Sequence, residues 1–371
     1  DRTRCRVRAC VRVWCVCMRL VAASLAATAA AVYLVRRRRR RWSVVAFYLL
    51  HEADVDELPL LEAAAASLSP GVTLSWGTEM SRAPPEATVF VARLPSAEAL
   101  DSLKRLRAVI VPFAGPTVTT RLLLRARPHL SLHNAHFNAQ STSELAVGLL
   151  LAAAKGVLAR DARLRAESLR GDQPWTAGWA VGGTSAPPPT LGGRTALVLG
   201  YGAVGGRVAK ALQGLGMHVL ACRRSAARPH FDGVATVHPS ADLDALLRRA
   251  FVLVVCLPGT ADTEALVGAR QLALLPVGAL LVNVGRGSVV EEAPLYAALR
   301  DGQLGGAGLD VWYNYPMLKG QGLGNEGCGP SSVGCPFHEL PNVVMSPHCG
   351  QLSDSKARDR VAELVGMLEE G

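Results

Sequence analysis

The chain has 371 residues, half of them hydrophobic, so it is long enough to bury a large core and to form two domains. Its formal charge of +10 would by itself suggest a nucleic-acid partner, but residues 1–42 hold 12 of the 40 basic residues and one of the 30 acidic ones. The rest of the chain, with 28 basic and 29 acidic residues, is close to neutral. A nucleic-acid-binding function is therefore excluded for the folded body.

Residues 1–42 have the composition of a leader. Sixteen uncharged residues, 20–35, precede six consecutive arginines. As a helix this run would extend about 24 Å, less than the hydrocarbon core of a bilayer. An arginine-rich, acid-poor composition favours an organelle-targeting segment, for a chloroplast or mitochondrion, over a weak signal anchor or a translated segment unrelated to the mature protein. A membrane partner is expected only if the leader is retained.

Cysteine and histidine usage indicates no metal site. Four of the nine cysteines lie in the leader, and the five in the body lack the spacing of a secreted disulfide framework. Cys328 and Cys335 could pair across a glycine-rich loop, but free thiols in a reducing compartment are the favoured interpretation.

From residue 43 onward the pattern predicts a globular α/β protein. Short apolar runs with the character of buried parallel strands occupy 44–48, 87–91 and 108–111. Helical patterns cover 97–107 and 144–157; the second is long and almost entirely apolar, as in a helix between two domains. A stretch rich in Gly, Pro, Ser and Thr, 182–193, precedes a second α/β series.

The second series opens with a glycine-rich turn. The strand-like run 195–199 leads directly into GYGAVG (200–205), and a helical pattern follows over 207–214. Here Gly200 would allow the tight turn, Gly202 would let the backbone approach a pyrophosphate, and Gly205 would let helix and strand pack closely. The sequence thus predicts a dinucleotide at this helix N-terminus rather than a nucleotide-free turn.

Two arginines follow the next predicted strand, 217–222. Arg223 and Arg224 stand where an acidic residue would hold the ribose 2′-hydroxyl of NAD. Guanidinium groups pair with a 2′-phosphate, so NADP is predicted in preference to NAD; the alternative is two solvated arginines at a strand end.

Four further motifs resemble the D-isomer-specific 2-hydroxyacid dehydrogenase family. They are Leu257-Pro258 with Thr263, LVNVGRGSVV (281–290), GAGLDVW (306–312) and NVVMSPHCG (342–350), in the family's order and spacing. The resemblance runs from about Ala87 to the C-terminus. It implies two doubly wound parallel-sheet domains around a cleft: a substrate domain of 43–160 plus 347–371, and a Rossmann domain of 161–346 inserted in it. The last helical pattern, 353–370, would return to the first domain.

The resemblance also implies residue roles. Arg286 would bind the substrate carboxylate and polarise the ketone, His348 would be the general acid/base, and the backbone of Ala114 and Gly115 would cradle the carboxylate. Asp310 would bond the nicotinamide carboxamide. The residues expected to contact the dinucleotide are Gly200, Gly202, Ala203, Val204, Gly205, Arg223, Arg224, Leu257, Pro258, Thr263, Val284, Gly285 and Asp310.

One position departs from the family. Tyr315 stands where the family places a glutamate that orients and charges the histidine. A phenol can orient an imidazole but supplies little charge, so His348 is expected to be weakly protonated at neutral pH. We consider Glu326 and Glu339 as groups that could assist, and the long glycine-rich segment 317–340 as a lid.

These features predict an oxidoreductase that transfers a hydride between NAD(P)H and a small 2-oxo acid or (R)-2-hydroxy acid. The alternatives are a corepressor-like protein that senses a dinucleotide, favoured by the missing glutamate, and a membrane-tethered structural protein, which rests on the leader alone. The apolar helix 144–157 further predicts a two-fold homodimer.

Overall fold

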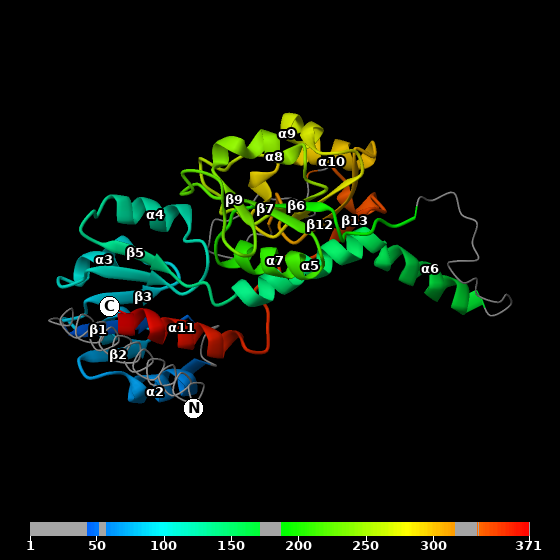
Figure 1. Cartoon of the computed structure of the whole chain (residues 1–371). Helices are drawn as coiled ribbons and strands as arrows, with labels where there is room; N and C mark the ends of the chain where they lie inside the picture. The colour runs from blue at the N-terminus through cyan, green and yellow to red at the C-terminus, as the bar shows by residue number, and fades with distance from the viewer. Residues whose placement is uncertain (1–42, 52–56, 171–186, 316–331, 333, 371) are drawn as a thin grey trace, which may run out of the picture.

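The computed structural model describes residues 43–51, 57–170, 187–315, 332 and 334–370. These residues form two α/β units, each built on a mainly parallel sheet (Figure 1), which confirms the predicted fold class. The leader, Glu326, Cys328 and most of the expected lid lie outside the described residues.

The first sheet has five parallel strands in the order β2-β1-β3-β4-β5. This is the order of a doubly wound sheet whose strand sequence reverses beside β1. The strands are β1 (Val44–Leu49), β2 (Val72–Gly77), β3 (Val89–Ala92), β4 (Ala108–Val111) and β5 (Ser131–Asn134). The helices are α2 (Leu58–Ser67), α3 (Ala97–Ser102), α4 (Val118–Arg125) and the C-terminal α11 (Lys356–Glu370), with a short 3-10 turn η2 (Met80–Arg82).

The second sheet has eight strands in the order β13-β12-β11-β10-β6-β7-β9-β8, and only β8 runs antiparallel to its neighbour. The strands are β6 (Thr195–Leu199), β7 (His218–Cys222), β8 (His230–Phe231), β9 (Thr236–His238), β10 (Val252–Val255), β11 (Ala279–Asn283), β12 (Leu304–Leu309) and β13 (Val343–Met345). The chain reverses direction across the sheet between β6 and β10, and open α/β sheets bind ligands at such a switch point.

The second sheet is covered by helices on both faces. They are α5 (Ala139–Lys155), α7 (Ala203–Gly214), α8 (Leu243–Leu247), α9 (Ala269–Leu274) and α10 (Glu292–Arg300), with 3-10 turns η3 (Ser240–Asp242), η4 (Gly287–Val289) and η5 (Phe337–Glu339). Side chains of β6, β10 and β11 such as Leu197, Leu253 and Val282 are fully buried between these layers. Continuous apolar runs are what a parallel strand buried on both faces requires.

Two predicted helices have different bounds in the structure. The helix expected over 97–107 ends at Ser102, because Leu103 leaves the helical region and both Leu103 and Leu106 turn into the core before β4. The helix expected over 144–157 begins at Ala139 and ends at Lys155, where Gly156 takes the left-handed conformation that closes it.

The long helix α5 belongs by its contacts to the second sheet. Ala146, Leu149 and Leu150 lie in one core with α7 and with strands of the second sheet. One face of this apolar helix is thus buried within its own chain, and the dimer predicted through it stays a prediction. The expected domain boundary at residue 160 stays a prediction. Because α5 packs on the second sheet, the chain passes from the first sheet to the second before Ala139.

The following helix, α6 (Val157–Arg170), projects away from both sheets (Figure 1). Val157, Leu158 and Leu164 on it are exposed. Among the described residues no single helix is long and apolar enough to cross a membrane, although α5 and the first part of α6, bent by 61°, meet that test as a pair.

The C-terminal helix α11 returns to the first sheet, where the sequence analysis expects the last helix (Figure 1). Val361, Leu364 and Leu368 pack with the core of β1 and α2. A buried ion pair joins Arg360 to Glu57 at 3.1 Å. Because removing one partner of such a pair leaves a buried charge, this contact fixes where α11 docks.

Candidate active site

The glycine-rich turn lies at the carboxyl end of β6, where the strand order reverses. Gly200 has φ of +100°, a conformation that favours glycine. A Cβ on Gly205 would lie 2.0 Å from the Gly200 carbonyl oxygen, so only glycine permits the close packing of α7 on β6. A Cβ on Gly202 would instead point into open space at the N-terminus of α7. Ala203 and Val204 supply the first amides of that helix, so the turn fits a pyrophosphate.

Two further loops border this turn. The loop after β10 is closed by Thr263, whose hydroxyl donates to the Pro258 carbonyl at 2.6 Å and accepts from the Thr260 amide at 2.9 Å. The loop after β11 packs directly against the loop after β10, since a Cβ on Gly285 would lie only 2.5 Å from the Leu257 carbonyl oxygen. The predicted residues of the three loops are therefore neighbours.

Asn283 positions the turn that carries Arg286, a role the sequence analysis missed. Its side chain accepts from the Gly285 amide at 3.1 Å and donates to the Arg286 carbonyl at 3.0 Å. Asn283 is buried at the end of a strand of apolar residues. A single polar residue at the end of an apolar strand could have indicated this role from the sequence, because a buried side-chain amide needs hydrogen-bond partners.

Arg286 reaches from the second domain to the first. Its Nη1 donates to the Gly285 carbonyl at 2.6 Å, and its Nη2 lies 2.8 Å from the position of a Cβ on Gly115. Gly115 has φ of +84°, which also favours glycine. Burial lowers the pKa of Arg286, Tyr315 acts in the opposite direction, and the charge of Arg121 on α4 lowers it again. The structure thus brings together two of the predicted substrate-contacting positions, Arg286 and Gly115, and Ala114 directly precedes Gly115 in its loop.

Asp310 holds the loop that carries His348. Its carboxylate accepts from the Ser346 hydroxyl at 2.6 Å, from the Cys349 amide at 2.9 Å and from the Gly350 amide at 3.0 Å. The Gly350 carbonyl accepts in turn from Thr142 of α5 at 3.0 Å. The nicotinamide contact predicted for Asp310 stays a prediction, whereas the observed contacts make it a positioning residue for His348.

His348 sits in a strained backbone conformation, with φ of +56°. Non-glycine residues adopt this region rarely, and where they do the surroundings must hold them there. The hydrogen bonds of Asp310 to the two following amides supply that restraint. Burial lowers the pKa of His348, the positive charge of Arg286 lowers it further, and Asp310 acts in the opposite direction. The expected weak protonation therefore has desolvation as its main physical cause.

Tyr315 lies beside His348, with ring centroids 5.4 Å apart. Its hydroxyl accepts a hydrogen bond from the Trp312 amide at 3.0 Å. Trp312, which the sequence analysis did not single out, donates from Nε1 to the Ser346 carbonyl at 2.8 Å. Tyr315, which the sequence analysis places where the family would have a glutamate, thus lies next to the imidazole; the substitution itself stays a prediction.

Glu339, proposed as an assisting group, does not act on His348 in the structure. It is exposed on η5 and lies 3.9 Å from His338. Residues 334–340 of the expected lid are ordered around Phe337, which is fully buried against Tyr296, Trp312 and Tyr313. A lid role for this end of the segment does not fit that packing.

Arg223 and Arg224 lie at the end of β7 with exposed side chains. Arg224 lies 3.5 Å from Asp262, and because both side chains are more than three-quarters exposed this contact contributes little. Both guanidinium groups are therefore accessible to a ligand at the neighbouring glycine-rich turn.

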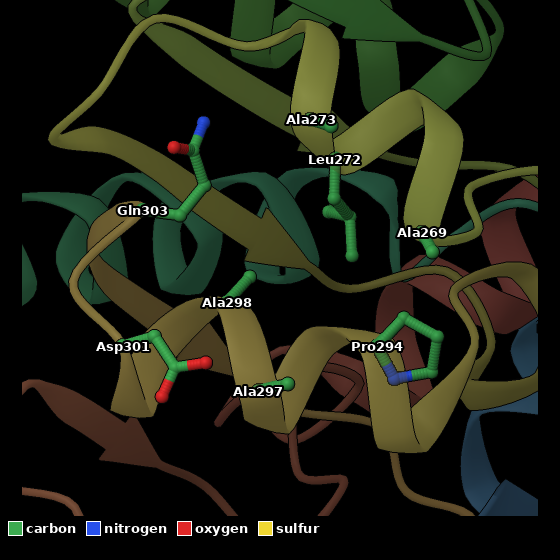
Figure 2. Close-up of a pocket in the computed structure, with 8 residues that line it drawn as sticks. All are labelled: Ala269, Leu272, Ala273, Pro294, Ala297, Ala298, Asp301 and Gln303. Atoms are coloured by element: carbon green, nitrogen blue, oxygen red, sulfur yellow. The ribbon is translucent and has the colours of Figure 1, made fainter.

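A shallow groove lies elsewhere on the second domain, between α9 and α10 (Figure 2). It is lined by Ala269, Leu272, Ala273, Pro294, Ala297, Ala298, Asp301 and Gln303. None of these residues belongs to the cluster around Arg286 and His348. Within the described ranges, no group of three or more His, Cys, Asp or Glu side chains could hold a metal ion, and Cys222, Cys256, Cys335 and Cys349 are free thiols.

Comparison with known proteins agrees with this geometry. Residues 147–350 match the model of the "D-isomer specific 2-hydroxyacid dehydrogenase, NAD binding domain" family. The chain is 30% identical to a glycerate dehydrogenase of Methylorubrum extorquens over 273 residues, 74% of this chain and 78% of the relative. It is 31% identical to glyoxylate/hydroxypyruvate reductase B of Pectobacterium carotovorum over 273 residues, 72% of this chain and 77% of the relative.

Solved structures share the fold at lower identity. A glyoxylate/hydroxypyruvate reductase of Sinorhizobium meliloti, in complex with NADP and malonate, superimposes with a TM-score of 0.59 at 23% identity, covering 87% of this chain and 91% of that one. A D-lactate dehydrogenase of Aquifex aeolicus, with NAD and lactic acid, gives 0.60 at 22% identity, covering 87% and 93%.

Proposed function

Because the chain belongs to the D-isomer specific 2-hydroxyacid dehydrogenase family, we propose that it reduces small 2-oxo acids such as glyoxylate or hydroxypyruvate to the corresponding 2-hydroxy acids, with the (R) configuration where the product is chiral, and oxidises the products in reverse. The observation that carries the proposal is the approach of Arg286 to Gly115 beside the loop of His348. A cation and a proton donor are then close enough to interact electrostatically, and reduction of a 2-oxo acid requires both groups beside the ketone.

The cofactor is NAD or NADP. The residues that would hold it are those of the glycine-rich turn, the loops after β10 and β11, and the arginines after β7. When bound, it supplies the hydride. We propose NADP as the preferred form, supported by the accessible guanidinium groups of Arg223 and Arg224 and the absence of an acidic residue at these two positions.

The chain's own residues would perform the remaining tasks. Arg286 binds the substrate carboxylate and polarises the ketone, since its guanidinium is charged and forked. His348 donates a proton to the developing alkoxide during reduction and accepts it during oxidation. The desolvation that lowers the pKa of His348 also strengthens the attraction between Arg286 and an anionic substrate.

A screen of the full chain with NADPH and NADH against glyoxylate, hydroxypyruvate and larger 2-oxo acids tests the proposal. We expect the native chain to turn over at least one 2-oxo acid. Arg286→Gln should lose this turnover but still bind the nucleotide. Tight nucleotide binding with no turnover of any 2-oxo acid would instead support a dinucleotide-sensing protein.

We also propose a homodimer, supported now by the exposed apolar residues of the projecting helix α6 rather than by α5. Light scattering at micromolar concentration should give twice the mass of one chain. The double variant Leu158→Glu, Leu164→Glu should have the mass of a single chain. A native monomer would contradict this assembly.

A further inference from the structure

A second arginine lies near Arg286 and has no role in the chemistry described above. Arg121 is in the first turn of α4, on the first domain. Its Nε donates to the Pro116 carbonyl at 3.2 Å. The preceding residue is Gly115, which Arg286 approaches from the opposite domain. The dipeptide 115–116 therefore contacts both guanidinium groups.

This arrangement is electrostatically unfavourable in the chain alone. A cation near a helix N-terminus opposes the helix dipole, and Arg121 lies one turn from the start of α4. Its charge also disfavours the charged form of the buried Arg286. Within the described part of the chain, neither arginine is among the ion-paired residues. Two close cations without a carboxylate are stabilised when an anion binds between or beside them.

The free donors indicate how such an anion would be shared. Arg286 donates one Nη to the Gly285 carbonyl. In the proposed function it binds the substrate carboxylate beside the ketone. Arg121 uses Nε for Pro116, which leaves its two Nη groups without a hydrogen-bond partner among the described contacts. The Arg121 side chain is half-buried, and these two groups form a planar donor pair of the kind that binds a carboxylate or phosphate.

We propose that Arg121 binds a second anionic group on the substrate, so that the protein favours 2-oxo acids carrying a carboxylate or a phosphate ester at the end away from the ketone. The inference rests on the proposed function, because that function assigns the first carboxylate to Arg286. Arg121 lies on the first domain and bonds to Pro116, next to the Gly115 backbone expected to contact the substrate carboxylate, which favours substrate over dinucleotide as its ligand.

The test compares three substrates in the full chain: glyoxylate with one anionic group, oxaloacetate with two carboxylates, and 3-phosphohydroxypyruvate with a carboxylate and a phosphate ester. The ratio of kcat/KM for each dianionic substrate to that for glyoxylate is measured in native protein, Arg121→Gln, Arg121→Lys and the control Arg125→Gln. Arg125 is exposed in the last turn of the same helix. Arg121→Gln should lower at least one ratio by about 10- to 100-fold, as expected for a lost hydrogen bond to a charged group.

Arg121→Lys should lose less, and Arg125→Gln should keep the native ratios. The substrate whose ratio falls identifies a carboxylate or a phosphate ester as the second group. If Arg121→Gln lowers kcat/KM equally for all three substrates, or for none, the inference is wrong.

A binding measurement separates this inference from the proposed function. Calorimetry with NADP⁺ present compares succinate and malonate with acetate, none of which is reduced. Tighter binding of a dicarboxylate that is lost in Arg121→Gln supports the second anion site even if no 2-oxo acid is turned over. Equal binding of acetate and both dicarboxylates, together with turnover of glyoxylate, overturns the site and leaves the proposed function standing.

Discussion

The Tyr315 and His348 rings pack against each other with centroids 5.4 Å apart, while the Tyr315 hydroxyl bonds to the Trp312 amide rather than to the imidazole. Tyr315 therefore occupies the space beside the histidine without serving as its hydrogen-bond partner. The charge state of His348 is governed instead by burial, by Arg286 and by Asp310.

Replacing Tyr315 with Phe should reduce stability but leave the pH dependence of reduction unchanged. The half-buried Trp312 amide would lose its acceptor, which costs about 1 kcal/mol of unfolding free energy. Chemical denaturation and the pH profile of kcat/KM check this. A lower rate with unchanged stability would instead show that the hydroxyl orients the imidazole.

Replacing Tyr315 with Glu should move the pH profile upward. Reduction needs the imidazolium, so its rate falls as pH rises through the pKa of His348, which burial holds below its usual range. A carboxylate beside the ring favours the charged form and should raise that pKa by about one unit. The falling limb of kcat/KM for reduction should shift to higher pH by the same amount. Superimposable native and Tyr315→Glu profiles would contradict the contact.

Asp310→Asn should impair both folding stability and catalysis. An amide can accept fewer of the three hydrogen bonds from Ser346, Cys349 and Gly350, so the unfolding free energy should fall by about 2–3 kcal/mol. A displaced imidazole should lower kcat by about 100-fold. Asp301→Asn, at an exposed carboxylate paired with Arg300, is the control and should change neither quantity strongly.

Gly115→Ala should disturb Arg286 directly. The new Cβ would meet Nη2, and the backbone with φ of +84° would be strained by about 1–2 kcal/mol. Gly71→Ala is the matched control, since its φ is +95° but nothing lies within 4 Å of its Cβ position. Both variants should lose similar stability in thermal unfolding, but only Gly115→Ala should raise KM for the 2-oxo acid. Equal KM values would mean that the Arg286 contact does not affect substrate binding.

Arg223→Asp should reverse the cofactor preference. The lost pairing with a 2′-phosphate should weaken NADPH binding by about 10- to 100-fold and leave NADH binding nearly unchanged. Arg228→Asp, which makes the same charge change at an exposed position five residues along, should alter neither Kd strongly. Fluorescence titration with both cofactors measures the effect. Tighter native binding of NADH than of NADPH would show that Arg223 is merely solvated.

The sequence by itself determined the local features of this protein. Gly200, Gly202 and Gly205 occur where a strand meets a helix, and glycine at those spacings has few physical explanations other than a phosphate-binding turn. The short apolar runs 44–48, 108–111 and 195–199 likewise predict buried parallel strands, and β1, β4 and β6 occupy these positions in the structure.

Only the tertiary structure decided the contacts between distant segments. The side chain of Arg286 lies against Gly115, 171 positions earlier in the chain, and Asp310 holds the amides of Cys349 and Gly350. Arg121 is held next to Gly115 by a hydrogen bond to the Pro116 carbonyl. Hydrogen bonds and burial of this kind depend on how two sheets pack, and a polar side chain in a local pattern does not reveal its partner. For the same reason the apolar pattern of α5 did not reveal that one of its faces packs against α7 in the core of the second domain.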